Sequence, residues 1–174
     1  RTALDALGWI GGAEWQDGEW FGRFADLDTE AYEALEAGVE AENPEVATAA
    51  CEAYARAAAA DECRRDRAVS CLLDRLAAED DDDVTEPVAI ALVRLTDGAD
   101  ITDDGAARTL LDVEASTSDD GRAAALRLLG RIDPSIGDRA SIERTLVEGM
   151  DVASKTVRRG AIDGAVGVLT RQAG

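Results

Sequence analysis

The chain repeats itself at a nearly constant spacing, and this repeat constrains the fold more than any other feature of the sequence. Four segments align without gaps: VATAACEAYARA from Val46, VTEPVAIALVRL from Val84, GRAAALRLLGRI from Gly121 and VRRGAIDGAVGV from Val157. Their starts lie 38, 37 and 36 residues apart. A period of this length is typical of helical repeats, in which each unit buries its apolar face against the next unit.

Within each segment, apolar and small residues recur at spacings of three and four. The fifth and sixth positions hold Ala50 and Cys51, Val88 and Ala89, Ala125 and Leu126, and Ala161 and Ile162. The ninth and twelfth positions hold Tyr54 and Ala57, Leu92 and Leu95, Leu129 and Ile132, and Ala165 and Val168. Because residues three and four apart share one face of an α-helix, each segment is predicted to be an amphipathic helix with this stripe in the core.

A second helix is expected after each of the first three segments. Its markers are the pairs Leu72 and Leu73, Leu110 and Leu111, and Leu146 and Val147, at nearly constant offsets from the segment starts. Thr102 before Asp103 and Asp104, and Asp61 before Glu62, are typical of helix starts. Pro44 and Pro134 are expected at the joints between helices. Each unit is therefore predicted to be a helical hairpin.

Both ends of the repeat array are irregular. Ala3, Leu4, Leu7 and Ile10 follow the same stripe, and a second helix is predicted over about Thr29 to Val39. This first unit carries about ten residues more than the others, and the surplus falls in residues 11–24. The last segment, Thr156 to about Arg171, has no second helix after it, so both ends resemble cuts or atypical caps of an array.

The sequence thus predicts a single all-α domain over residues 1–174: an α-solenoid of about four and a half hairpins and roughly nine helices. The expected units are residues 1–42 with the insertion at 11–24, 43–80, 81–117, 118–152 and a terminal half-unit at 153–174.

GRAAALRLLGRID, from Gly121 to Asp133, resembles the first helix of a HEAT repeat of the short, phycobiliprotein-lyase-like type. The resemblance covers essentially the whole chain, because the four segments are in register. It implies an α-solenoid whose second helices line the concave side, and a role as a protein-binding scaffold or adaptor. It leaves two alternatives open: a lyase-like or chaperone-like subunit that positions a cofactor or client, and a HEAT-like DNA glycosylase.

The charge balance is extreme, with 18 Arg and Lys against 37 Asp and Glu and a formal net charge of −19. Lys155 is the only lysine, and Asp outnumbers Glu. This composition resembles that of proteins from salt-accumulating halophilic archaea, in which dense carboxylates keep the surface hydrated in molar salt. The alternative is an acidic surface that attracts a basic partner or mimics nucleic acid.

Composition also excludes several classes of function. The chain has no histidine, which removes the commonest general base and metal ligand, so no enzymatic activity, cofactor or metal is expected. No stretch is long and apolar enough to span a membrane, and no secretory signal is present, so a cytoplasmic location is expected. Duplex nucleic acid is disfavoured because its binding normally depends on a basic face. The expected partner is another protein, and the oligomeric state is left open.

Two groups of residues are candidates for contacting that partner. The first lies in the insertion, and its members are Trp15, Trp20, Phe21 and Arg23. All the Trp and Phe residues of the chain gather within 16 residues around this insertion. These rings either cover the end of the solenoid or anchor a partner. The second is a set of arginines on the predicted second helices, Arg64, Arg65, Arg67, Arg108, Arg139 and Arg144. They form either a solvated, salt-bridged face or a groove for an acidic partner segment.

Overall fold

The computed structural model describes residues 14–16, 19–21, 29–59, 62–78, 82–97, 99–103, 105–116 and 118–172. Helices account for most of these residues, as predicted. The helices are α2 (Thr29–Val39), α3 (Pro44–Ala58), α4 (Glu62–Ala78), α5 (Asp82–Leu95), α6 (Ala106–Ser116), α7 (Asp119–Leu129), α8 (Arg139–Met150) and α9 (Lys155–Gln172). The first helix of the expected first unit, around Ala3 to Ile10, lies outside the described residues.

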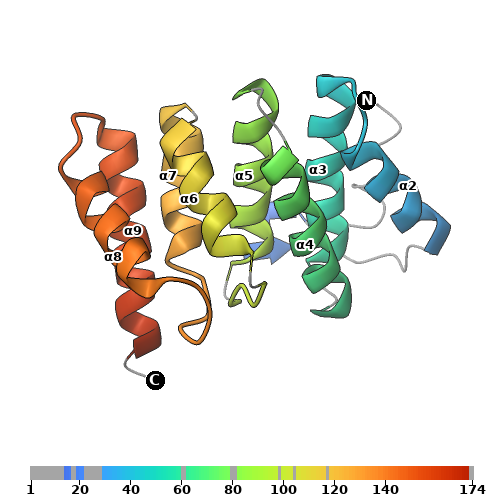
Figure 1. Ribbon diagram of the computed structural model, residues 1–174. Helices are drawn as coiled ribbons and strands as arrows, with labels where there is room; N and C mark the ends of the chain where they lie inside the picture. Colours follow the sequence, from blue (N-terminus) through green and yellow to red (C-terminus); the bar gives the residue numbers. More distant parts are fainter. Residues whose placement is uncertain are drawn as a thin grey trace.

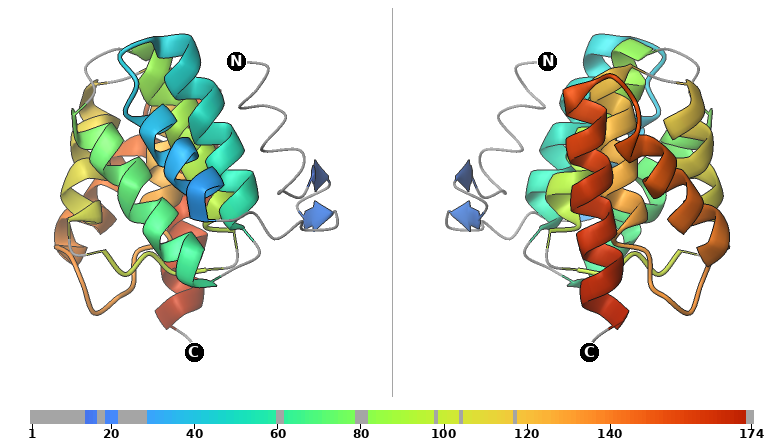
Figure 2. Two further views of the ribbon diagram at one scale, coloured as in Figure 1. Left: turned by 90° about the vertical axis from the view of Figure 1, so that its right-hand side faces the viewer. Right: turned by 90° about the vertical axis from the view of Figure 1, so that its left-hand side faces the viewer.

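The helices form two layers (Figures 1 and 2). In one layer α3, α5, α7 and α9 lie side by side in chain order, each in contact with the next. In the other layer α2, α4, α6 and α8 do the same. The core between the layers is built mainly from Ala, Leu and Val side chains, with the ring of Tyr54 fully buried among them. Successive helices of the chain therefore alternate between the two layers.

The starts of the first-layer helices follow from local capping. All four begin two residues before the starts of the aligned segments, at Pro44, Asp82, Asp119 and Lys155. Asn43 caps α3 by accepting hydrogen bonds from the amides of Glu45 (3.0 Å) and Val46 (3.3 Å), and Pro44 occupies the first turn, where no amide hydrogen is needed.

The helix α6 begins at Ala106, shortly after the predicted start signal at Thr102 and Asp103. Asp103 forms a turn ahead of the helix, in which its Oδ1 accepts a hydrogen bond of 2.8 Å from the amide of Gly105.

The insertion contains the only β-structure extended enough to form strands in the described residues. The strands β1 (Glu14–Gln16) and β2 (Glu19–Phe21) pair antiparallel, with the Cα atoms of Trp15 and Trp20 directly opposite each other. This hairpin departs from the all-helical expectation, and alternation of Trp with polar residues over such short runs is too weak a signal to distinguish a strand.

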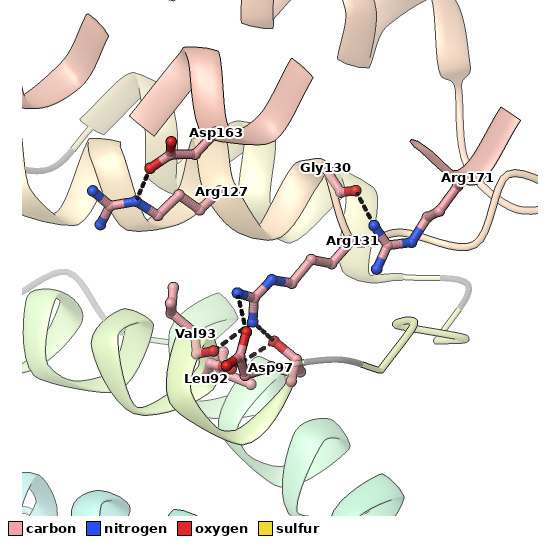
Figure 3. A network of polar contacts seen from close by, with 9 residues as sticks. Leu92, Val93, Asp97, Arg127, Gly130, Arg131, Asp163 and Arg171 are labelled. Carbon is pink, nitrogen blue, oxygen red and sulfur yellow. Dashed lines mark hydrogen bonds and ion pairs between the residues drawn. The ribbon is translucent and has the colours of Figure 1, made fainter. Parts of the chain in front are cut away.

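Arginines tie α7 to α5 and α9 to α7 (Figure 3). From the end of α7, Arg131 Nη1 donates to the carbonyl of Val93 (2.5 Å) and to Thr96 Oγ1 (3.1 Å), and its Nη2 pairs with Asp97 (3.1 Å). From the end of α9, Arg171 donates to the carbonyl of Gly130 over 3.0 Å and pairs with Asp100. These contacts join the carboxyl ends of neighbouring helices, so α5, α7 and α9 run parallel.

Glycines let α9 approach α7 more closely than other side chains would allow. A Cβ atom placed on Gly164 would lie 2.2 Å from the backbone oxygen of Leu126, and one on Gly160 would lie 2.5 Å from that of Ala123. Gly167 meets Gly130 in the same way, at 2.5 Å. The helices are therefore packed backbone to backbone along this line.

Candidate protein-binding surfaces

The predicted arginines of α4 contact α2. The guanidinium of Arg64 stacks on the ring of Tyr32, with Cζ 3.8 Å from the ring centroid. Arg67 donates to Glu36 Oε2 over 2.6 Å, and this hydrogen bond raises the pKa of Arg67. Both side chains line a small pocket between α2 and α4. They are thus already engaged in holding the two helices together.

Glu36 also connects this pair to α3. Its other oxygen accepts a hydrogen bond of 2.5 Å from the hydroxyl of Tyr54. Burial, followed by this bond to Glu36, raises the pKa of Tyr54 well above its usual range. Tyr32 packs edge-on against Tyr54, with ring centroids 6.2 Å apart, and donates to the carbonyl of Ala57 (2.7 Å). The cluster fixes α2 on α3 and α4.

Arg65 faces a different neighbour. Its Nη2 donates to the carbonyl of Ala59 at the end of α3 over 2.7 Å. Its Nε is buried and has no hydrogen-bond partner. Arg64, Arg65 and Arg67 therefore all contact neighbouring segments of the chain, although the Arg67 side chain stays 69% exposed. Both alternatives, a salt-bridged face and a groove for an acidic partner segment, remain predictions.

A second cleft continues along α2 and α4 beyond this cluster. It encloses about 440 Å³ and is lined by carboxylates, by Arg67 and Arg75, and by Cys71. Burial, reinforced by Glu36 and Glu40, raises the pKa of the Cys71 thiol to about 11. Cys51, deeper in the core, has its pKa raised to about 12, mainly by burial. Both thiols are therefore protonated at neutral pH and are poor nucleophiles.

The remaining predicted arginines lie on α6 and α8 and are exposed. Arg139 pairs with Glu143 one turn later on the same helix (2.8 Å), and Arg144 donates to Ser141 Oγ (3.1 Å). Arg108 makes no hydrogen bond or ion pair with any described residue. Exposed pairs of this kind contribute little to stability, which leaves these side chains available to a partner.

The aromatic candidates are described only in part. The structure gives the backbone pairing of Trp15, Trp20 and Phe21 in the β1–β2 hairpin and nothing of their side chains. Arg23 lies outside the described residues. Whether this segment is a cap or a binding loop therefore stays as predicted from the sequence, with both alternatives open.

A further surface, not expected from the sequence, covers the end of the stack formed by α8 and α9 (Figure 2, right). It carries the large apolar side chains that are most exposed among the described residues: Val147 (60%), Ile162 (52%), Val166 (56%) and Leu169 (64%). We call these four residues the end face. On α9 they follow a spacing of four and three, so Ile162, Val166 and Leu169 lie on one side of the helix.

The repeat explains why these residues are apolar. Ile162 occupies the sixth position of its segment, where Cys51, Ala89 and Leu126 are all fully buried. Val147 is equivalent to Leu73, which is 4% exposed, and to the partly buried Leu111. On α7 the residues that meet α9 are Ala123, Leu126 and Gly130; their equivalents on α9 are Arg159, Ile162 and Val166. The end face is thus the surface through which each earlier hairpin contacts its successor.

The stripe that predicted core positions therefore failed at Ile162. The periodicity of one segment shows which residues share a face, but it does not show whether another helix covers that face. The order of the segments was the available signal, because the last first-type helix has no successor among the aligned segments.

No protein-family model matches the chain, and none of the curated proteins matches its sequence. None of the helices in the described ranges is long and apolar enough to cross a membrane. Within the same ranges, no three Cys, Asp or Glu side chains come together in a way that could hold a metal ion.

Proposed function

We propose that this chain is a protein-binding scaffold, an α-solenoid built from HEAT-type helical hairpins. The regular alternation of helices between two layers and the constant register of the four aligned segments support this architecture. Such a stack displays an extended surface on each layer and at each end, and its function lies in what those surfaces bind.

The observation that carries the proposal is the end face. Four large apolar side chains, each more than half exposed, gather on two adjacent helices at positions that elsewhere in the chain are buried or partly buried between helices. Contiguous exposed apolar patches on a folded domain are typical of protein interaction sites. Because these positions contact a helix elsewhere in the chain, the end face is suited to a further amphipathic helix, and we infer that a binding partner supplies it.

Affinity capture tests the proposal. The chain is immobilised in a native extract at high salt and compared with a Val166→Asp, Leu169→Asp variant, in which the end face is charged. We expect the variant to lose proteins that the unmodified chain retains, because a buried carboxylate without a partner weakens an apolar interface.

Two further baits control the experiment. An Ala77→Asp, Ala115→Asp variant places the same two charges at exposed sites on α4 and α6 and is expected to retain the captured proteins. A Trp15→Ala, Trp20→Ala bait tests the insertion separately. The proposal fails if the end-face variant retains every protein that the unmodified chain retains.

A further inference from the structure

The charge of α9 distinguishes it from the rest of the molecule. In a chain with a net charge of −19, this helix carries Lys155, Arg158, Arg159 and Arg171 but a single carboxylate, Asp163. Asp163 is paired with Arg127 of α7 over 3.1 Å (Figure 3). The helix that presents most of the end face is therefore cationic.

Only some of these cations are available to a partner. Arg171 is held by Asp100 and by the carbonyl of Gly130, and Arg158 donates to the carbonyl of Val152 over 3.4 Å. Lys155 and Arg159 are exposed, and neither makes a hydrogen bond or an ion pair with a described residue. They are the two cations that remain free on this helix within the described ranges.

These two cations are in line with the apolar stripe. Arg159 precedes Ile162 by three residues, and Lys155 lies one turn earlier, so both share the side of α9 that carries Ile162, Val166 and Leu169. The positive end of the helix dipole adds to their field. The exposed side of α9 is therefore cationic along its first turns and apolar along the rest.

The first turns of the other first-layer helices show which charge would match the cationic first turns of α9. They begin with carboxylates: Glu45 in α3, Asp82 and Asp83 in α5, and Asp119 and Asp120 in α7. The helices of this layer run parallel, so a helix packed on α9 in the same sense would bring its first turn beside Lys155 and Arg159. Carboxylates in that turn would face cations, and lysines there would face like charges.

We propose that the end face docks an amphipathic helix of another protein, parallel to α9, with carboxylates in its first turns and small or branched apolar residues along its contacting side. This inference rests on the proposed function and specifies its partner. A second copy of the chain fits less well, because α9 against α9 would join two cationic helices on two molecules of high negative charge.

A pair of synthetic helices tests this directly. The probe is a fluorescein-labelled peptide as long as α9, with glutamates in its first two turns and Ala and Leu along one side; the matched peptide carries lysine in place of each glutamate. By fluorescence anisotropy with the whole chain, we expect the acidic peptide to bind at least about tenfold more tightly than the lysine peptide. We expect Val166→Asp to weaken that binding about tenfold or more.

Charge reversal supplies the decisive control. A Lys155→Glu, Arg159→Glu variant should reverse the preference between the two peptides, whereas Ala77→Glu, which adds a carboxylate at an exposed site on α4, should leave it unchanged. Equal binding of both peptides, or binding of neither, overturns the inference.

Two other occupants would also overturn it. A doubling of the sedimenting mass that Val166→Asp abolishes would identify a second copy as the occupant. Binding to phosphatidylserine vesicles that the charge reversal abolishes would identify a lipid surface and would equally overturn it.

The two proposals fail separately. If Val166→Asp, Leu169→Asp loses captured proteins while the peptides show no charge preference, the scaffold function stands and the acidic helix is wrong. If neither assay responds to the end-face substitutions, both are wrong.

Discussion

At the scale of single residues, one position of the aligned segments supplies two contacts between neighbouring first-layer helices. The eleventh position of the four segments reads Arg56, Arg94, Arg131 and Gly167. Arg56 pairs with Glu52 within α3, Arg94 reaches from α5 to the same carboxylate, and Arg131 reaches back from α7 to the end of α5. In α9 an arginine would not fit, because Gly167 touches Gly130, and Arg171 binds from one turn later instead. The sequence shows that three of the four segments have arginine at the eleventh position, but it does not show which residues these arginines contact.

Arg131 is bonded to three groups at the end of α5, so its replacement is expected to lower the stability of the fold. It is largely buried, and this burial lowers its pKa against the opposing effect of Asp97. Arg131→Lys keeps the charge, but a single ammonium cannot satisfy the Val93 carbonyl, Thr96 and Asp97 together. We expect the free energy of unfolding to fall by about 1–3 kcal/mol, as measured by urea denaturation.

Arg139→Lys serves as the matched control. Its pair with Glu143 is exposed and lies within one helix, so we expect a change of no more than about 0.5 kcal/mol. If the two substitutions lowered the free energy of unfolding equally, the contacts of Arg131 between helices would stabilise the fold no more than an exposed pair within one helix.

At the scale of helices, the packing of α9 on α7 depends on the absence of side chains. Gly164→Ala would raise helix propensity by nearly 1 kcal/mol in isolation. Here the added Cβ would lie 2.2 Å from the oxygen of Leu126 and 2.7 Å from the side chain of Leu146, so the helices must separate. We expect a net loss of about 2 kcal/mol and a lower melting temperature by circular dichroism.

Gly105→Ala gives the comparison. The added Cβ would meet only the side chain of Asp103, at 3.2 Å, and that side chain can move. We expect little change in melting temperature. If Gly164→Ala were as well tolerated as Gly105→Ala, the close approach of α7 and α9 would be refuted.

Much of this helical layer could be predicted from the sequence, because hydrophobic periodicity reports local geometry directly. The bounds of α2 agree with prediction, and the first-layer helices begin a constant two residues before the aligned segments. What could not be predicted depends on contacts between units. The exposure of Ile162 depends on whether another helix packs on α9, which the periodicity of its own segment does not encode. The internal partners of Arg64 and Arg67 depend on the position of α2, which periodicity within α4 does not encode.

At the scale of the whole molecule, the net charge of −19 is distributed unevenly. The free cations Lys155 and Arg159 lie on α9, whereas α2 begins the described stack with Glu30 and Glu33, both exposed. The arginines that tie first-layer helices together neutralise only a few carboxylates, such as Glu52 and Asp97. Most of the remaining acids repel one another across the surface, and this repulsion opposes the compact state.

The composition therefore leads to a prediction about salt. At about 1 M salt the screening length falls to roughly 3 Å, which suppresses repulsion between surface carboxylates but weakens the partly buried Arg131 contacts much less. We expect helicity and the midpoint of urea unfolding to increase from millimolar to molar KCl, as followed by circular dichroism.

A Glu30→Gln, Glu33→Gln, Glu40→Gln variant removes three exposed charges from one end of the stack. It should be more stable than the unmodified chain at low salt, and its stability should increase less with KCl. A chain that is fully helical and equally stable at both extremes would show that the acidic surface is not an adaptation to salt, and would favour the alternative that it attracts a basic partner.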